Sequence, residues 1–232
     1  MVSARRKACA VPVRIYSVMK IKKIGHCCLV VEERGVRLLT DPGAYSSGQE
    51  DERDVSAILI THEHQDHLHL DSLKLILDNN PQAQIITNTA VGKKLAELNI
   101  PFDKVEHGQK IVVGGLEIEG FGEKHAEIFE EFGMVQNTGY FIGEKLFYPG
   151  DAFTNPGRKV DILALPVAGP WMKLSEAIIY AKQVNPKCAF PVHDGLLSAQ
   201  SVGGTTKRIP AAVLEQLGIR FVPMSAGDEQ EF

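Results

Sequence analysis

The chain has 232 residues, of which 44% are hydrophobic, 23% charged and 7% aromatic. This is enough to bury a large core, since a fold near this size hides roughly 70–75% of its unfolded surface, and it excludes the disordered, collagen-like and fibrous classes. The 25 Lys and Arg residues against 29 Asp and Glu give a net charge of −4, which argues against a protein that holds nucleic acid by bulk electrostatics.

No apolar run approaches the ~18–20 residues needed to span a bilayer, so we predict no transmembrane segment. Residues 1–18 begin with a basic cluster, but Pro12 and Arg14 interrupt the apolar stretch before the core of a signal peptide can form. We expect this segment to be a poorly ordered extension and residues 19–232 to form a single domain. The four cysteines show no C-x-x-C spacing, which favours reduced thiols in a cytoplasmic protein.

The first half of the chain is predicted to alternate short strands with helices. β-Branched residues indicate the strands, and Asp71 is predicted to cap the first helix. In chain order, these elements are strands at 21–24, 27–33, 36–40 and 56–60, a helix from Asp71, a strand at 84–87, a helix at 89–98 and a strand at 102–106.

The second half begins with two predicted hairpins, which turn at Gly114-Gly115 and Gly143-Glu144, and then returns to alternating strands and helices. Its elements are strands at 110–113, 116–121, 134–142, 145–148 and 162–165, a helix at 173–184, a strand at 187–191, a helix at 209–217 and a strand at 220–222. The two halves therefore share one arrangement of strands followed by helices.

The most informative segment is an H-x-H-x-D-H motif, made by His62, His64, Asp66 and His67. It lies on the loop that leaves a buried strand, and it precedes a capped helix, unlike a histidine tag at a terminus. Three imidazoles and a carboxylate in this loop can converge on a metal ion. These ligands suit zinc, manganese or iron, whereas a thiolate site would need cysteines.

One loop leaves the coordination incomplete, and three further residues are candidates to complete it. His125, Asp151 and His193 each stand just past the end of a predicted strand, where such folds build their sites. Taken singly, each is more typical of a turn, but their order after the motif favours metal ligands. His107, at a turn before a hairpin, is an alternative to His125.

This succession of motifs resembles the metallo-β-lactamase superfamily over nearly all of the chain from Met19 to Phe232. The resemblance implies an α+β fold, an αββα sandwich of two mixed β-sheets flanked by helices, with a metal cleft along one edge. The opening Gly25-His26-Cys27-Cys28 and the pair Asp41-Pro42 look most like the small metal-dependent hydrolases similar to ascorbate-6-phosphate lactonase.

The resemblance also implies an arrangement of ligands. It places one divalent metal ion on His62, His64 and His125 and a second on Asp66, His67 and His193, with Asp151 between them. Zinc is the first expectation, and manganese, iron or nickel are alternatives. The two ions would share a hydroxide that attacks a small-molecule ester, lactone or phosphoester.

Other residues are expected to assist these ligands. Asp66 is the expected catalytic residue, which orients the attacking water or moves its proton. Asp41 and His26 are expected to support the ligands rather than bind metal. Trp171, the only tryptophan, is expected either to wall the pocket or to pack in the core.

Two other functions share parts of this pattern. A metal-dependent phosphodiesterase or nuclease, such as the transfer-RNA 3′-processing enzymes, has the same motif, but the negative net charge and the lack of an inserted arm for gripping RNA disfavour it. A mononuclear iron redox enzyme would not need the second set of ligands. We therefore expect a small-molecule substrate, neither nucleic acid nor membrane as partner, and, as in the resembled subfamily, a homo-oligomer.

Overall fold

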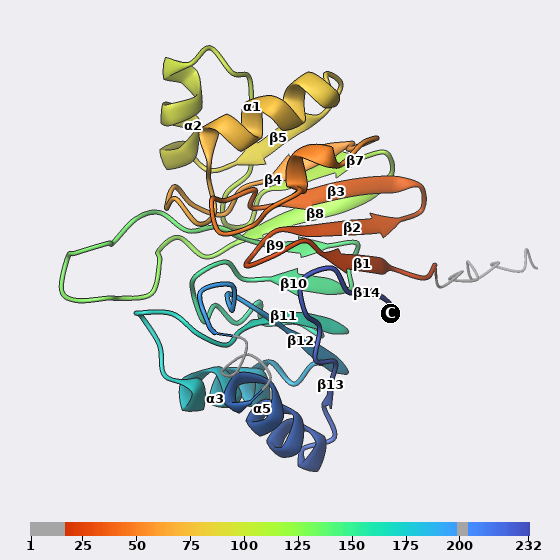
Figure 1. The fold of residues 1–232 in the computed structure, drawn as a ribbon, viewed down its shortest axis with the longest axis vertical. Helices are drawn as coiled ribbons and strands as arrows, with labels where there is room; N and C mark the ends of the chain where they lie inside the picture. The colour runs from red at the N-terminus through yellow and green to blue at the C-terminus, as the bar shows by residue number, and fades with distance from the viewer. Residues whose placement is uncertain (1–16, 199–203) are drawn as a thin grey trace, which may run out of the picture.

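The computed structural model describes residues 17–198 and 204–232, which form two β-sheets packed face to face with helices outside them (Figure 1). The sheets are seven-stranded, with the orders β14-β1-β2-β3-β4-β5-β6 and β13-β12-β11-β10-β9-β8-β7. In each sheet, antiparallel strands on one side adjoin parallel strands on the other. The predicted sandwich of two mixed sheets is confirmed.

The first sheet is built from the first half of the chain and one returning strand. Its strands are β1 (Lys20–Lys23), β2 (Leu29–Glu33), β3 (Val36–Thr40), β4 (Ala57–Leu59), β5 (Gln84–Thr87), β6 (Asp103–Lys104) and β14 (Glu229–Glu231). Helices α1 (Leu70–Asn79) and α2 (Thr89–Glu97) cover its outer face, and a short 3-10 helix, η1 (Gln49–Asp51), precedes β4.

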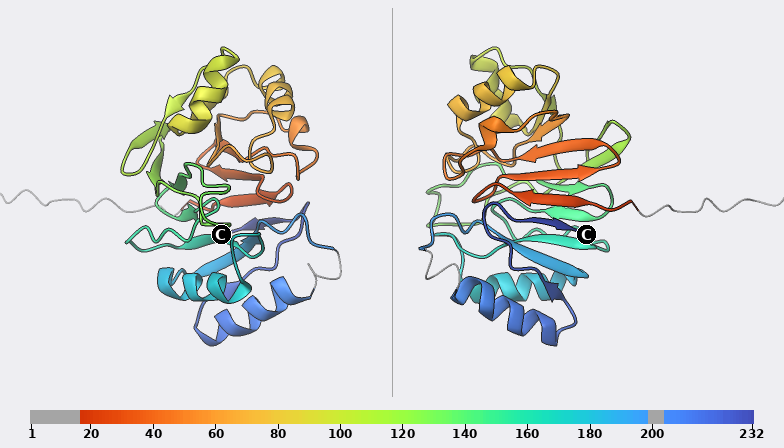
Figure 2. Two further views of the ribbon diagram at one scale, coloured as in Figure 1. Left: turned by 90° about the vertical axis from the view of Figure 1, so that its left-hand side faces the viewer. Right: turned by 45° about the vertical axis from the view of Figure 1, so that its right-hand side comes forward.

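The second sheet follows the same plan on the other side of the sandwich. Its strands are β7 (Lys110–Val113), β8 (Leu116–Phe121), β9 (Gly139–Ile142), β10 (Leu146–Tyr148), β11 (Ile162–Pro166), β12 (Cys188–Val192) and β13 (Arg220–Phe221). Helices α3 (Leu174–Val184) and α5 (Thr205–Gln216) pack on its outer face. Figure 2 shows the two groups of helices on opposite sides of the paired sheets.

Alternating side chains divide the core into three layers. In β4, Ala57 and Leu59 join the cluster between the sheets, whereas Ile58 joins the cluster under α1 and α2, because successive strand residues point to opposite faces. Cys27 and Cys28 are divided in the same way. The sheets are thus buried on both faces.

Several predicted boundaries are wrong. Helix α1 is capped by His69, whose side chain accepts from the backbone N–H of Ser72, and Asp71 lies in its first turn. Helix α5 begins at Thr205 rather than at 209, and Lys207 in its first turn donates to Ser225 Oγ at 2.7 Å. Strand β9 is shorter than predicted, since the residues before Gly139 bond to loops instead.

The sequence pattern did not predict β14, whose three residues are all exposed. It pairs antiparallel with β1, and Met19 and Phe232 exchange two backbone hydrogen bonds beside it. Most of the predicted extension, residues 1–16, lies outside the described residues, but the hydroxyl of Ser17 donates to Glu33. Within the described residues, no helix is long and apolar enough to cross a membrane.

Candidate metal centre

Loops that leave five strands bring the candidate residues to one edge of the sandwich. Strand β3 leads into Asp41 and β4 into the H-x-H-x-D-H loop, while β8, β10 and β12 lead toward His125, Asp151 and His193. Because β3 and β4 are parallel, as are β10, β11 and β12, their carboxyl ends reach the same edge. The fold therefore assembles the site from segments far apart in the chain.

The first group of side chains consists of His62, His64 and His125. One ligand atom from each lies within 4.8 Å of the others, and Nε2 of His62 is 3.1 Å from Nδ1 of His64. The hydroxyl of Thr61, 3.0 Å from Nδ1 of His62, holds that ring from behind. Three nitrogen donors thus converge on one point.

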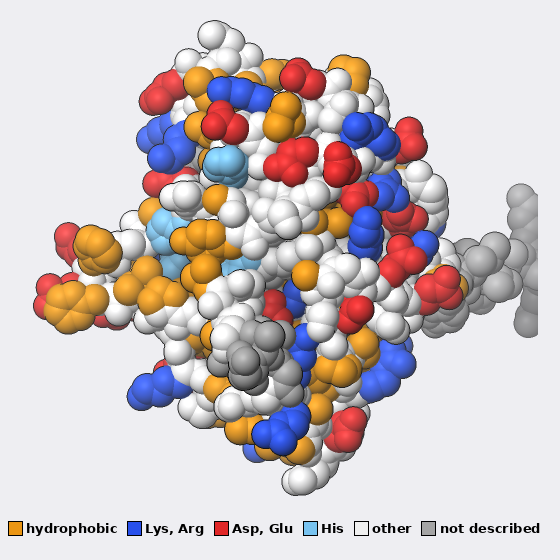
Figure 3. Space-filling view, viewed as in Figure 1, with side chains coloured by type: hydrophobic (Ala, Val, Ile, Leu, Met, Phe, Trp, Pro, Cys, Tyr) orange, Lys and Arg blue, Asp and Glu red, His pale blue; other side chains and the backbone are white. Residues whose placement is uncertain are grey.

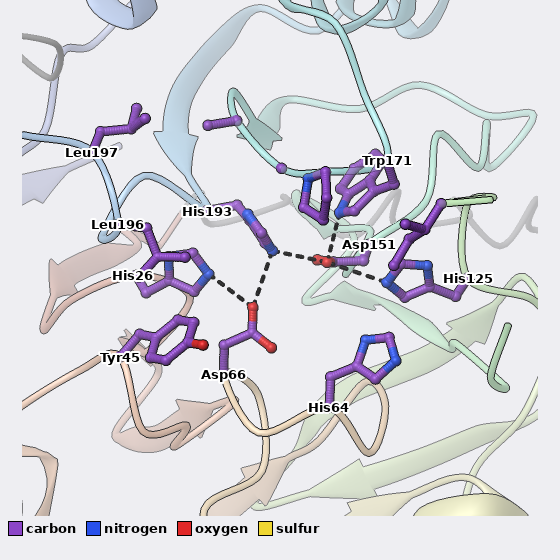
Figure 4. A pocket seen from close by; sticks show the side chains of 14 residues that line it. His26, Tyr45, His64, Asp66, His125, Asp151, Trp171, His193, Leu196 and Leu197 are labelled. Carbon is purple, nitrogen blue, oxygen red and sulfur yellow. Dashed lines mark hydrogen bonds and ion pairs between the residues drawn. The ribbon is translucent and has the colours of Figure 1, made fainter. Parts of the chain in front are cut away.

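The second group consists of Asp66, His67, Asp151 and His193, again with ligand atoms within 4.8 Å of one another. Asp151 lies between the groups. Its Oδ1 is 3.1 Å from Nε2 of His67. Its Oδ2 is 2.8 Å from Nε2 of His193 and 3.4 Å from Nε2 of His125 (Figure 4). One carboxylate therefore reaches both sets of imidazoles.

Four buried atoms at this point make no hydrogen bond within the described residues: Nε2 of His67, His125 and His193, and Oδ1 of Asp151. Buried polar atoms in native proteins are nearly always satisfied, and an unpaired group calls for an ion or water. Imidazole nitrogen and carboxylate oxygen are also the donors that zinc and similar ions take. The residues present therefore fit a bound divalent cation.

The charges of the site agree with this fit. Burial alone would raise the pKa of Asp151, but His67 and His193 lower it well below its usual range. Burial lowers the pKa of His62 well below its usual value, so that its imidazole is neutral. Burial would also lower the pKa of His67 and His193, but the Asp151 carboxylate raises both, and a metal ion at this point would take the place of their protons.

Asp41 lies behind the second group and is fully buried. Its carboxylate accepts hydrogen bonds from the N–H and hydroxyl of Thr61, each at 2.7 Å, from Nδ1 of His67 at 2.7 Å and from the hydroxyl of Tyr148 at 2.6 Å. Its backbone has a φ of 35°, a strained value for a residue other than glycine. These bonds leave Nε2 of His67 facing Asp151.

Gly43 lets the Asp41 turn approach the motif loop closely. A Cβ at this position would lie 1.8 Å from the carbonyl oxygen of Asp66. The N–H of Ala44 donates to the carbonyl of Gln65 at 2.9 Å, which fastens the two loops together. Only glycine fits here, and the contact sets the position of Asp66.

His26 and His107, the two remaining histidines considered, have different surroundings. Nε2 of His26 is 3.2 Å from Oδ2 of Asp66, and its Nδ1 accepts from the N–H of Gly195 at 2.9 Å. His107 accepts from the N–H of Gly122 at 3.2 Å and belongs to neither group of candidate ligands. The structure thus brings His125 to the other ligands and leaves His107 away from them.

The sequence predicted Trp171 as a pocket wall or a core residue, and it lines the pocket, but its bond to Asp151 and several other partners that hold the site were missed. Nε1 of Trp171 donates to Oδ2 of Asp151 at 2.8 Å, and Asn137 accepts from the Asp151 N–H at 3.1 Å. The ammonium of Lys23 is buried against Asp194 at 2.6 Å. No local pattern marks these partners, because each pair is formed by segments distant in the sequence.

Cys27, predicted from the sequence only as a reduced thiol, also lies at this site. Its sulfur lies within 4.8 Å of a ligand atom of His26, His67 and His193. Burial would raise the pKa of this thiol, but His67 and His26 lower it to about 6. Cys27 therefore adds a soft donor atom beside the second group.

A pocket of about 350 Å³ opens over the two groups (Figure 4). Its floor contains His64, Asp66, His125, Asp151 and His193. The remaining wall is formed by His26, Tyr45, Ile128, Ala168, Gly169, Pro170, Trp171, Leu196 and Leu197. This volume lies at the lower end of the range for small-molecule sites.

Comparisons with known proteins agree with the fold and the motifs. Residues 20–193 match the model of a β-lactamase superfamily domain. The chain is 37% identical over 190 residues to Protein Rv0786c of Mycobacterium tuberculosis, covering 80% of this chain and 88% of that protein. It is 28% identical over 194 residues to a UPF0173 metal-dependent hydrolase of Carboxydothermus hydrogenoformans, covering 75% and 84% of the two chains.

Solved structures share the architecture at low sequence identity. Igni18, a metallo hydrolase from Ignicoccus hospitalis, superposes with a TM-score of 0.74 at 19% identity, covering 93% of this chain and 98% of that one. The metallo-β-lactamase fold protein YhfI from Bacillus subtilis superposes with a TM-score of 0.67 at 15% identity, covering 93% and 100%. These two likenesses concern the fold alone.

Proposed function

The chain belongs to the metallo-β-lactamase superfamily and is a metal-dependent hydrolase, and we propose that it holds two divalent metal ions and hydrolyses a small-molecule ester, lactone or phosphoester. The superfamily predicted from the H-x-H-x-D-H motif is thereby confirmed. The closer similarity to ascorbate-6-phosphate lactonase remains a prediction.

One observation carries the proposal of two ions. Asp151 lies within 3.4 Å of Nε2 of His125, which belongs to the first group, and within 3.1 Å of Nε2 of His67, which belongs to the second. Both nitrogens are buried without a hydrogen bond. A single ion would satisfy one group and leave the other with unpaired buried donors, at a cost of about 1–3 kcal/mol each.

In this proposal, His62, His64 and His125 hold one ion, and Asp66, His67 and His193 hold the other, with Asp151 as a ligand of both. Two divalent ions bound there would polarise the scissile carbonyl or phosphoryl oxygen and lower the pKa of a shared water toward 7, which supplies a hydroxide at neutral pH.

The chain's own residues would position the attacking water. Asp66 is placed to orient the attacking water, because Nε2 of His26 at 3.2 Å and Nε2 of His193 at 3.4 Å hold its Oδ2 in position. Burial alone would raise the pKa of Asp66, but the imidazoles of His193 and His26 lower it far below its ordinary value. Its carboxylate therefore stays ionised, and His26 is a positioning residue.

The proposal further includes zinc as the metal, a cytoplasmic location, a homo-oligomer and a single domain over residues 19–232. The His and carboxylate donors support zinc. The thiols of Cys27, Cys28 and Cys188 are free, which supports a reducing compartment.

The test is elemental analysis of protein purified without chelators, combined with hydrolysis assays on the same sample. About two zinc or manganese ions per chain, together with hydrolysis that chelator abolishes and added metal restores, is the expected result. A single iron per chain with no hydrolysis would overturn the proposal and favour oxygen or sulfur redox chemistry.

A further inference from the structure

The pocket over the metal centre is lined mainly by apolar side chains, apart from its histidines and aspartates. Apart from the histidines and aspartates, the side chains that line it are those of Tyr45, Ile128, Ala168, Pro170, Trp171, Leu196 and Leu197, with Gly169 between them. Among the lining side chains, the polar groups outside the candidate metal ligands are the imidazole of His26, the hydroxyl of Tyr45 and the indole N–H of Trp171, which donates to Asp151.

No Lys or Arg of residues 17–198 and 204–232 lines this pocket. Lys23, a buried cation three residues before the lining residue His26, is not free to bind a substrate. Its ammonium donates to Asp194 at 2.6 Å and to the carbonyl of Pro191 at 2.8 Å. Binding sites for phosphates and carboxylates use Arg or Lys to compensate the charge. The described wall therefore offers an anionic substituent of the substrate no partner outside the metal centre.

The apolar surface continues beyond the pocket mouth. Phe129 and Phe132 are 69% and 77% exposed, and they lie on the loop that also carries His125 and Ile128. Leu196, on the opposite wall, is 67% exposed. In Figure 3, hydrophobic side chains gather beside the pale blue histidine side chains. Large exposed apolar side chains next to a pocket are typical of a ligand-binding surface.

We propose that the substrate is an uncharged ester or lactone that carries an apolar acyl or aryl group, which packs against Trp171, Ile128 and Leu196. This inference rests on the proposed function, which supplies the hydrolysis. Water adds across the acyl C–O bond, which breaks to give a carboxylate, an alcohol or phenol, and one proton. Substrates that carry a phosphate away from the scissile bond are disfavoured, because the described wall offers that phosphate no cation.

The first experiment measures kcat/KM of the metal-loaded protein on 4-nitrophenyl acetate, butyrate and octanoate and on 4-nitrophenyl phosphate. We expect kcat/KM to rise about fourfold for each added methylene until the pocket is filled, since each buried CH₂ contributes roughly 0.8 kcal/mol. The phosphate ester should be at least 100-fold worse than the octanoate. Equal values along the acyl series, or a preference for the phosphate, would overturn the inference.

A binding measurement separates this inference from the proposed function. Trp171 is the only tryptophan of the chain and lines the pocket, so its fluorescence reports occupancy without catalysis. We expect 1-octanol to shift the emission at lower concentration than 1-butanol, and inorganic phosphate to cause no apolar shift. A shift with octanol but no ester hydrolysis would sink the hydrolase and keep the pocket assignment. Hydrolysis without any fluorescence response to octanol would keep the hydrolase and overturn the pocket assignment.

A pair of matched variants tests the wall itself. Leu196→Gln replaces a pocket-lining side chain, and Leu75→Gln replaces a side chain on α1 that is 52% exposed and outside the pocket. We expect Leu196→Gln to lower the octanoate-to-acetate ratio of kcat/KM about fivefold and Leu75→Gln to leave it unchanged. Leu196 is 67% exposed, so the variant should fold. An unchanged ratio in Leu196→Gln would therefore contradict the assignment of this side chain to the pocket wall.

Discussion

Nδ1 of His67 donates a hydrogen bond to Oδ2 of Asp41 at 2.7 Å, and neither side chain is exposed to solvent. This bond occupies Nδ1, so that Nε2 is the nitrogen that faces Asp151 and is left to bind a metal ion. Carboxylates behind metal-binding histidines orient the ring and raise its basicity, and their loss weakens metal binding about 10- to 100-fold.

Asp41→Asn should therefore weaken binding of the second metal ion by about that factor. The amide keeps the shape of the side chain but removes the charge, and it forces one of the four donors around Asp41 to face an N–H₂ group. Metal affinity is measured by competition with a chromogenic chelator. Asp71→Asn, on the exposed first turn of α1, is the control, and equal affinity in both variants would refute the supporting role of Asp41.

His67→Ala should reduce the metal content to about one ion per chain and abolish most hydrolysis, because it removes a ligand that only the second group contains. His107→Ala should retain two ions, since His107 bonds to Gly122 and lies outside both groups. Elemental analysis of the two variants decides the matter. If His107→Ala lost a metal and His125→Ala did not, the assignment of His125 would be wrong.

Trp171→Phe should lower kcat/KM about tenfold while the metal content stays at two. The phenyl ring fills most of the space of the indole, but it cannot donate to Asp151 as Nε1 does at 2.8 Å, and hydrogen bonds to charged groups contribute roughly 1.5–3 kcal/mol. The pH profile of kcat is measured alongside, because a loss of packing alone would leave it unmoved. An unaltered profile with full activity would show that the indole serves only as a wall.

The Lys23–Asp194 pair should be a buried unit whose halves depend on each other. Lys23→Met leaves the Asp194 carboxylate without its 2.6 Å partner and should cost about 3–5 kcal/mol of the free energy of unfolding. Burial lowers the pKa of Lys23, although Asp194 opposes the shift. In urea titrations, Lys23→Met with Asp194→Asn should recover much of the loss, and strict additivity of the two changes would argue against coupling.

Glu106 should make the stability of the protein depend on pH in the acid range. Hydrogen bonds from the side chains of Thr89 and Gln136 lower the pKa of Glu106 from 4.5 to about 2. The folded pKa lies below the unfolded one, so the stabilisation is complete above pH 4.5 and is lost as the pH falls toward 2. Glu106→Gln should lower the melting temperature by about 2–4 °C at pH 7 and by less at pH 3. A constant difference at both pH values would exclude this explanation.

The features that can be predicted from the sequence are those that depend on residues close together in the chain. The strand before His62 is a continuous apolar run, and the ligands follow strand ends, so both the alternating fold and the order of the motifs can be predicted from neighbouring residues. Trp171 and Asn137 bond to Asp151 across 20 and 14 residues, and no periodicity specifies such a meeting. The exposed strand β14 escapes prediction for a related reason, since its partner β1 is some 200 residues away and its residues carry no apolar pattern.

The position of β14 also affects the order in which the chain can fold during synthesis. Strand β1 forms an edge of the first sheet until residues 229–231 pair with it, and ribosomes add about 5–20 residues each second. The open edge therefore persists for roughly 10–40 s after β1 has emerged. Unpaired strand edges attract other chains, and charged side chains on the edge, here those of Lys20 and Lys22, oppose such pairing.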